Sequence, residues 1–373
     1  MADTPASSGR LVSLDQFRGY TVLGMFLVNF VGSYAAVKTL VPVLCHHHTF
    51  CSYADTIMPQ FFFAVGFAYR MTFLHRLNST GPRTAYWHTV KRNLGLLLVA
   101  FVIHHLDGRY DSWEKLHAAG LAGLWQTAFH RNFFQTLTHI AVTALWILPV
   151  IAARPTTRLL FAFFSAVLFH GLSVWGYYDW VLKRPGIDGG PLGFLTWTIP
   201  MIVGTLASDA VAAKRPWLIG RLLVGSVAIM LVGYGLSCLN RVTPPNTAPG
   251  TDWSALLLEF PFVAPTQPIN IWTMSQRAGS VSYLTFGAGF SLAIYALFVL
   301  ACDVWPLRVG LFRTLGTNAL AGYIIHDLVN EAVKPFVPKD SPLWFVFAAF
   351  GVSLLICYLF LRSMEKQRLF LKL

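Results

Sequence analysis

RLVSLDQFRGYTVLGMFLVNF, residues 10–30, decides the fold, because charged residues at its start give way to an apolar run with an asparagine near its end. Asp15, Arg18, Val22, Met25 and Asn29 follow one another at intervals of three or four residues. This spacing predicts a helix that carries them along one face. At 1.5 Å per residue, Asp15 and Asn29 stand about 21 Å apart. An Asp/Arg pair that caps the helix and snorkels at a membrane surface explains the charged end equally well.

The composition of the whole chain indicates a membrane protein. Hydrophobic residues make up 55% of its 373 residues and charged residues only 12%, so much of the surface must face lipid. The formal net charge of +12 comes from Lys and Arg residues spread along short loops rather than gathered in one stripe. We therefore expect a lipid bilayer around the chain and no nucleic-acid partner.

Ten apolar runs are long enough, or nearly so, to cross a hydrocarbon core of about 30 Å. They lie near residues 17–37, 56–74, 93–106, 136–153, 159–178, 194–212, 217–238, 280–302, 308–332 and 342–362. The sequence thus predicts an all-α, polytopic bundle of about ten transmembrane helices. The third run is short and Pro200 interrupts the sixth, so nine or eleven crossings stay open.

The Lys and Arg residues beside these runs indicate the orientation. Most of the 28 fall on one set of connecting segments, which the positive-inside rule assigns to the cytoplasm together with both termini. Residues 1–16 lack the features of a cleaved signal, so we expect a cytoplasmic segment followed by a retained helix. We expect one multi-pass domain over residues 1–373 in the inner or plasma membrane, with extended outer-face segments at 107–134, which includes an amphipathic helix, and 240–279.

CHHHTFC, residues 45–51, lies at the outer face in this topology and allows three interpretations. Its histidines and cysteines are zinc-ligand types, but adjacent histidines do not easily converge on one ion, so we expect no metal. A Cys45–Cys51 disulfide suits that compartment, although spacing alone does not establish its geometry. The third interpretation is an imidazole that acts as a base near neutral pH.

Five segments, taken in order, carry a family resemblance. The first is residues 10–30 followed by SYADTIMPQFFFAVGFA, and the later ones are FFQTLTHIAV, GGPLGFLTWTIPMIVGTLASD, PINIWTMSQRAGSVSYLTFGAG and LGTNALAGYIIHD. Together they resemble the heparan-α-glucosaminide N-acetyltransferase family of transmembrane acyltransferases over nearly the whole chain. SLDxxRG by itself also occurs in other membrane acyltransferases.

The resemblance implies transfer of an acetyl group from cytosolic acetyl-CoA to an amine of an amino sugar or glycan on the far side of the membrane. It also implies an active-site histidine in the outer loop, in a His-x-x-aromatic stretch shortly before Asp55. HHTF, residues 47–50, matches that spacing best, so His47 is the first choice and His48 the second. The register leaves His46 open, because FCS replaces the family's Trp-x-Gly.

The residues themselves suit the same chemistry. Amine attack on a thioester needs a base near ambient pH and hydrogen-bond donors for the developing oxyanion. Asn29 joins the histidines and Asp55 as a catalytic candidate, and the oxyanion or substrate candidates are Gln135, His139, Asn318 and His326. A core histidine accounts better for His139 taken alone, and helix packing accounts for Asn318 equally well.

At the cytoplasmic end, Asp15, Arg18 and Arg313 are the candidates for binding CoA, because guanidinium pairs well with phosphate. Positive-inside charge explains Arg313 just as well, and also Arg92 as a further phosphate contact. Direct transfer and a covalent acyl-histidine relay both remain open. So do O-acetylation of an envelope polysaccharide, a transporter of small solutes, and a homodimer.

Overall fold

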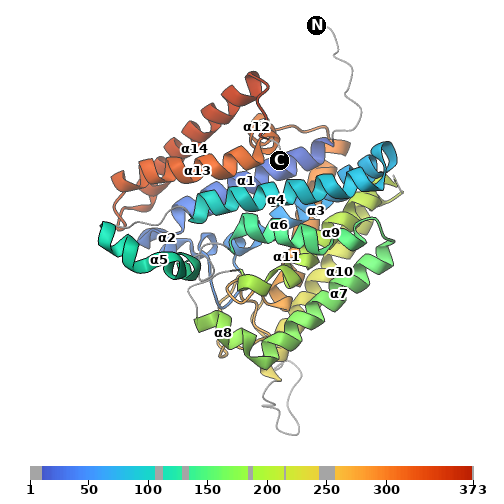
Figure 1. The fold of residues 1–373 in the computed structure, drawn as a ribbon, viewed down its shortest axis with the longest axis horizontal. Coiled ribbons are helices and arrows are strands. Elements are labelled where there is room, and N and C mark those ends of the chain that lie inside the picture. Colours follow the sequence, from blue (N-terminus) through green and yellow to red (C-terminus); the bar gives the residue numbers. More distant parts are fainter. Residues whose placement is uncertain are drawn as a thin grey trace.

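The computed structural model describes residues 11–105, 112–127, 134–183, 188–213, 216–242 and 257–371, and every regular element in these ranges is helical (Figure 1). The α-helices are α1 (Val12–Val31), α2 (Ala35–Leu40), α3 (Tyr53–Thr80), α4 (Pro82–His105), α5 (Trp113–Thr127), α6 (Thr136–Trp146), α7 (Pro155–Leu172), α8 (Tyr178–Lys183), α9 (Phe194–Ala212), α10 (Leu218–Cys238), α11 (Val281–Val299), α12 (Gly310–Thr317), α13 (Ala319–Val333) and α14 (Leu343–Lys366).

Six helical segments are long and apolar enough to cross a membrane, so the chain is an all-helical, multi-pass membrane protein. Those containing α3, α9 and α11 have 61–67% of their most apolar window buried inside the protein, whereas those containing α7, α10 and α14 have only 17–22% buried. The first three therefore form the centre of the bundle, and the last three present apolar faces outward at its edges (Figure 1).

The central helices approach closely because glycine occupies their contact points. A Cβ on Gly66 of α3 would lie 2.0 Å from the carbonyl oxygen of Met201 in α9, and one on Gly204 of α9 would lie 2.1 Å from that of Phe63 in α3. Small residues allow this close packing where no hydrophobic effect drives helices together in lipid. The contact holds α3 at a fixed depth, which matters because α3 carries much of the site.

Three charged side chains, of which Asp209 is 28% exposed, join helices of the same centre, and we call them the compensated cluster. Arg70 of α3 donates from Nε to Oδ1 of Asp209 in α9 at 2.9 Å, and Arg158 of α7 donates to Oδ2 of the same carboxylate. Arg158, which is 0% exposed, also donates to Thr205 Oγ1 at 2.7 Å. Each arginine therefore has a carboxylate partner and further hydrogen bonds.

Some apolar runs contain breaks that the sequence analysis did not anticipate. The run 17–37 divides into α1 and α2, since Tyr34 is extended and Gly32 packs against the carbonyl of Leu44. The run 308–332 divides into α12 and α13, because Asn318 leaves the helical region at φ −123°. A π-helical turn, Ser173–Tyr177, with φ +112° at Gly176, follows α7 and leads into α8.

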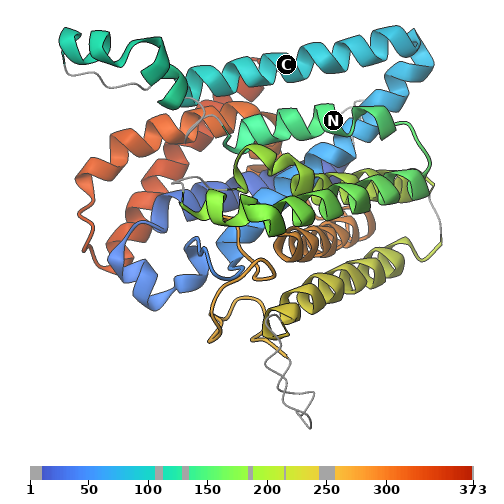
Figure 2. The same ribbon diagram turned by 60° about the horizontal axis from the view of Figure 1, so that its bottom comes forward.

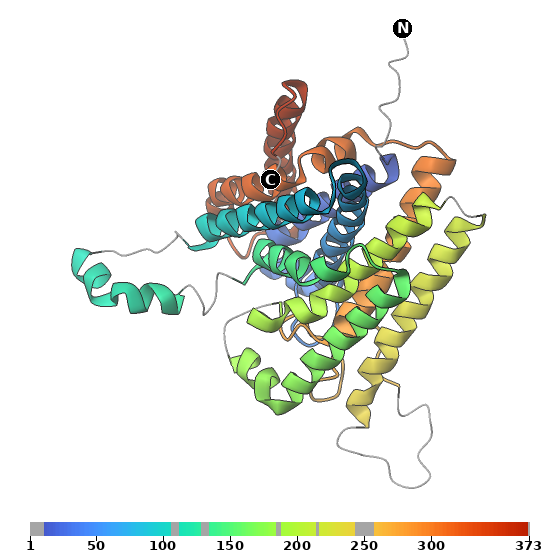
Figure 3. The same cartoon turned by 45° about the vertical axis from the view of Figure 1, so that its right-hand side comes forward.

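The two segments predicted to lie at the outer face are described only in part. Helix is present within 107–134 as α5, which bends at Gly120 and lies at one side of the bundle (Figures 2 and 3). The flanks of that segment, residues 243–256 of the segment 240–279, and residues 1–10 lie outside the described residues. Residues 257–280 follow an irregular path that closes over the start of α3, where Phe262 N donates to the Cys51 carbonyl.

Candidate active site

Asp55 organises the loop that enters α3. Ser52 is the N-cap: its backbone N–H donates to Asp55 Oδ2 at 2.9 Å, and its Oγ accepts from the Asp55 N–H at 3.4 Å. The one hydroxyl hydrogen of Ser52 is shared between Asp55 Oδ2 at 2.9 Å and the Cys45 carbonyl at 2.8 Å. This reciprocal capping satisfies backbone groups at the helix start and holds the carboxylate in place. Asp55 is completely buried, and Tyr283 of α11 donates to its backbone oxygen at 2.6 Å. The loop 45–52 is thus fixed to two central helices.

His46 is the histidine that meets this carboxylate. Its Nδ1 donates to Asp55 Oδ1 at 2.9 Å, which leaves Nε2 as the basic nitrogen. The ring is 39% exposed, so a substrate can reach it. Burial lowers the pKa of His46, but the hydrogen bond and charge of Asp55 outweigh that effect and raise it overall. A histidine oriented by a carboxylate is the usual arrangement of a general base.

His47 and His48 have other contacts. The His47 ring donates from Nε2 to the Pro42 carbonyl at 2.9 Å and stacks on Phe50 at 4.2 Å. Its backbone N–H, rather than its ring, reaches Asp55. His48 is exposed at the surface, but the protein around its ring removes enough water to lower its pKa, and the charge of Arg277 lowers it further. Of the three histidines that the sequence left open, only His46 has its ring on Asp55.

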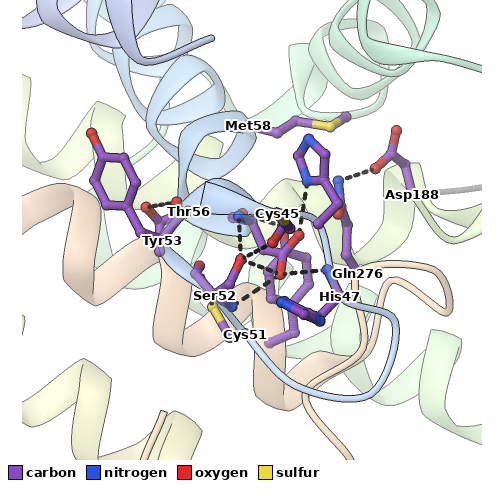
Figure 4. A network of polar contacts seen from close by, with 12 residues as sticks. Cys45, His47, Cys51, Ser52, Tyr53, Thr56, Met58, Asp188 and Gln276 are labelled. Carbon is purple, nitrogen blue, oxygen red and sulfur yellow. Dashed lines mark hydrogen bonds and ion pairs between the residues drawn. The ribbon is translucent and has the colours of Figure 1, made fainter. Parts of the chain in front are cut away.

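Cys45 and Cys51 are both buried free thiols, so the structure does not contain the disulfide that the sequence left open. The Cys45 carbonyl accepts a hydrogen bond from Ser52, and burial raises the pKa of Cys51 well above its usual value. The loop is therefore held by Asp55 and Ser52 (Figure 4). Within the described residues, no three His, Cys, Asp or Glu side chains are placed to hold a metal ion.

Asn29 and His326 are brought together, 297 positions apart in the chain. His326 donates from Nδ1 to the Tyr323 carbonyl at 2.5 Å, so its Nε2 accepts from Asn29 Nδ2 at 3.2 Å. The His326 ring stacks on Phe26 of α1, and its Nε2 also lies 3.2 Å from Asp327 Oδ1. These contacts join the end of α1 to α13 near the entry to α3.

The other substrate or oxyanion candidates lie apart from this pair. Gln135 is the N-cap residue of α6, and His139, one turn later, is fully buried beside Phe134 and Trp197 as a core histidine would be. Asn318 donates to the Leu369 carbonyl and accepts from Leu371 N–H, so it fastens the C-terminal segment. Neither His139 nor Asn318 contacts His46.

A cavity of about 790 Å³ enters the bundle from the end where α3 meets α4. Its walls come from α1, α3, α4, α6, α13 and the C-terminal segment. The α3 wall is one helical face: Phe61, Ala64, Val65, Ala68, Tyr69, Thr72 and Arg76. Their spacing of three or four residues runs back to Met58 and Asp55, so one side of α3 connects the cavity to the histidine loop.

Arginine side chains line this cavity, and we call Arg18, Arg76 and Arg92 the cavity cluster. Burial lowers the pKa of Arg92, and the positive charges of Arg18 and Arg76 lower it further. Asp15 is the one acidic residue among the described lining residues. Arg313 is not part of the lining; it is 67% exposed and pairs with Glu365 at 3.1 Å.

A side-chain contact connects the cavity lining to the first turns of α3. Thr136 of α6 and Tyr323 of α13 line the cavity, and Thr136 Oγ1 donates to the Met58 sulfur at 3.8 Å. Met58 follows Asp55 by three residues, so both lie toward one side of α3 near its start. The charge of Asp188, which precedes α9, acts on Tyr323.

Sequence reasoning missed several of these residues. Arg76 reads as ordinary positive-inside charge, and Thr136 and Tyr323 as parts of apolar runs. The periodic face of α3 was the available signal, because it continues from Arg76 to Asp55 without a break. A comparison with protein-family models finds no match for this chain, and a comparison with curated proteins finds none either.

Proposed function

We propose that this protein is a membrane acetyltransferase that takes an acetyl group from cytosolic acetyl-CoA and delivers it to an amine on the outer face. The observation that carries the proposal is the cavity, which is lined by Arg18, Arg76 and Arg92 and also by Thr136, whose hydroxyl contacts Met58 one turn after Asp55. This arrangement matches a long molecule with a polyanionic head and a reactive thioester tip. The family resemblance of the sequence supports the same chemistry.

The cavity cluster would hold the phosphates of CoA, because guanidinium forms short charge-assisted bonds to phosphate oxygens. The apolar wall of α3, from Ala68 to Phe61, would carry the pantetheine arm inward. Arg76 and Asp55 are 21 residues apart, which corresponds to about 31 Å along the helix. That length is close to the hydrocarbon thickness of a bilayer, so the donor need not cross the membrane as a whole.

His46 is the proposed base in place of His47, because its ring alone is oriented by Asp55. In direct transfer, the amine nitrogen bonds to the acetyl carbon, the carbon–sulfur bond breaks, and His46 moves the amine proton to the departing thiolate. Asn29 is the proposed donor to the oxyanion, through the second hydrogen of its amide, and His326 positions that amide by accepting the first. In a relay, the acetyl group would first bond to His46 Nε2 and then pass to the amine.

We further propose ten crossings, both termini in the cytoplasm, and a location in the inner or plasma membrane. Helix occurs within each of the ten apolar runs. Arg18, Arg76 and Arg92 all come from segments that the positive-inside rule assigns to the cytoplasm, and they line the same cavity. This grouping supports the proposed orientation. His46 lies on a segment assigned to the outer face.

The test uses the full chain in sealed vesicles of uniform orientation, with radiolabelled acetyl-CoA outside the cytoplasmic face and glucosamine on the opposite side. We expect labelled N-acetylglucosamine on the acceptor side. His46→Ala should lower the rate by about 100-fold or more, as loss of a general base does, whereas the matched variant His47→Ala should keep most of it. No transfer by the wild type, or full transfer by His46→Ala, would contradict the proposal.

The same vesicles separate the alternatives. Labelled protein that accumulates without acceptor, and disappears in His46→Ala, supports the relay, while CoA release only in the presence of acceptor supports direct transfer. Label on hydroxyl groups of an added glycan would favour O-acetylation. Movement of unmodified solute without CoA release would favour a transporter.

A further inference from the structure

Asp188 is a carboxylate that the reaction described above does not use. It lies between α8 and α9 and is 1% exposed. Among the described residues, Gln276 Nε2 donates to its Oδ1 at 3.1 Å. Its Oδ2 is buried and has no hydrogen-bond partner among the described residues. A buried carboxylate with an unsatisfied oxygen costs free energy, so it is expected where a ligand needs it.

The turn around Asp188 is built to hold this side chain in one place. Asp188 has φ +66°, and Gly189 and Gly190 continue with φ +80° and +60°. Gly189 N–H donates to the Arg277 carbonyl, and a Cβ on Gly279 would lie 2.8 Å from Gly189 Cα. Two loops are therefore pressed together backbone to backbone. A non-glycine residue in this conformation is strained, and such strain gathers at functional sites.

Gln276 links this carboxylate to the proposed base. Its amide donates to Asp188 Oδ1 (Figure 4), and its side chain raises the pKa of His46. The charge of Asp188 acts on His46 and on Tyr323, which lines the cavity. Asp188 thus acts on the proposed base and on the cavity lining.

An amine acceptor needs two proton acceptors, whereas an alcohol needs one. At neutral pH the acceptor arrives as R–NH₃⁺, which must lose a proton before its nitrogen lone pair can attack. The attacking nitrogen then loses a second proton as the amide forms. His46 accounts for the second proton, which goes to the thiolate of CoA. No residue named in the proposed transfer accepts the first proton.

We propose that Asp188 is the acceptor-recognition residue of the transferase: its Oδ2 binds the ammonium group of an amino sugar and removes the first proton. The carboxylate gains that proton, the neutral amine attacks the acetyl carbon, and Asp188 releases the proton to solvent before the next acceptor binds. This inference rests on the proposed function and narrows its acceptor to a primary amine.

The protonation of Asp188 fits this role. Burial raises the pKa of Asp188 to about 7, opposed by the Gln276 hydrogen bond and the His46 charge. A carboxyl group with that pKa both accepts and returns a proton near neutrality. Its titratable neighbours on the packed elements are His46, Asp55, Tyr283 and Tyr323.

The experiment measures binding of glucosamine and of N-acetylglucosamine to the purified full chain without donor, by calorimetry. We expect the wild type to bind glucosamine about tenfold tighter, as one charge-assisted hydrogen bond provides. Asp188→Asn should lose that preference, and asparagine tolerates the positive φ of the turn. Asp179→Asn, an exposed aspartate on the adjacent α8, should keep it.

The pH dependence gives a second readout. Glucosamine affinity of the wild type should fall as pH drops through about 7, the pKa of Asp188. Asp188→Asn should retain only the weaker dependence due to His46. Equal glucosamine affinity in the wild type and Asp188→Asn, with CoA binding intact in both, would overturn the inference.

The two proposals fail in different ways. A wild type that binds glucosamine through Asp188 but neither binds CoA nor transfers acetyl groups would overturn the transferase and leave the ammonium site. A wild type that acetylates only hydroxyl groups would keep the transferase and overturn the role of Asp188.

Discussion

The protein contains two groups of arginines whose surroundings differ in kind. In the compensated cluster, Arg70 and Arg158 share the carboxylate of Asp209 and join α3, α7 and α9. In the cavity cluster, Arg18, Arg76 and Arg92 line a cavity of about 790 Å³, and the charges of Arg18 and Arg76 both lower the pKa of Arg92. The first arrangement joins its charges across three helices. The second gathers three cations and one carboxylate, Asp15, around a space that a polyanionic ligand could enter.

The largest expected effect comes from breaking the compensated cluster. Asp209→Asn leaves Arg70 and Arg158 inside the bundle without a carboxylate, and Arg158 is completely buried. Removing one partner of a buried ion pair typically lowers the free energy of unfolding by about 3 to 5 kcal/mol. Unfolding of the detergent-solubilised protein measures the change, and Asp179→Asn is the exposed control, expected within about 0.5 kcal/mol of wild type. Equal behaviour of the two variants would contradict the structural role.

The next effect concerns the ligand rather than the fold. Arg18→Gln and Arg92→Gln should each weaken CoA binding by about tenfold to a hundredfold, because a hydrogen bond to a charged group contributes about 1.5 to 3 kcal/mol. Calorimetric titration with CoA measures the change. Dephosphorylated pantetheine should be almost insensitive to either substitution, and equal losses for both compounds would argue against phosphate recognition.

The same substitutions should affect stability in the opposite direction to Asp209→Asn. Without ligand, Arg92→Gln relieves repulsion from Arg18 and Arg76 as well as the burial of a charge. We expect the free energy of unfolding to stay unchanged or to rise by up to about 1 kcal/mol, with a smaller gain at high salt, where charges are screened. A marked loss of stability would assign Arg92 to the fold instead.

The smallest effect is expected at Arg313. It is 67% exposed and pairs with Glu365 outside the cavity, so Arg313→Gln should change CoA affinity by less than about twofold. The measurement is the same titration. A loss of CoA affinity as large as that of Arg18→Gln would show that Arg313 belongs to the CoA site, as the sequence predicts.

Long apolar helices were readable from the sequence because their signal is local. The runs 194–212 and 217–238 agree closely with α9 and α10. The helix break at Asn318 was missed because the apolar pattern continues through it. The backbone leaves the helix there, and the Asn318 side chain bonds the C-terminal segment, a contact that local sequence does not reveal. Six crossing helices follow from length and composition, while the ten crossings stay a prediction.

The sequence predicted several individual site residues but did not show which of them lie together. Asn29 and His326 were chosen as polar residues near one membrane face, and the structure places them 3.2 Å apart. The choice among three consecutive histidines depends on which way each ring points, and the capping geometry of Asp55 decides that. Asp188 stands in a glycine-rich turn whose importance depends on contacts with a loop almost ninety positions away.

Photolabelling tests the central claim most directly, because that claim concerns where the acyl group of the donor lies. An acyl-CoA with a diazirine on its acyl group would be bound to the full chain, irradiated, and mapped by mass spectrometry. The account predicts label on Thr136 or Tyr323, which line the cavity, or on Met58, which Thr136 contacts. This label should be lost in the presence of excess CoA and in the double variant Arg18→Gln/Arg92→Gln. Label confined to the outward faces of α7 and α14, or insensitive to CoA, would contradict it.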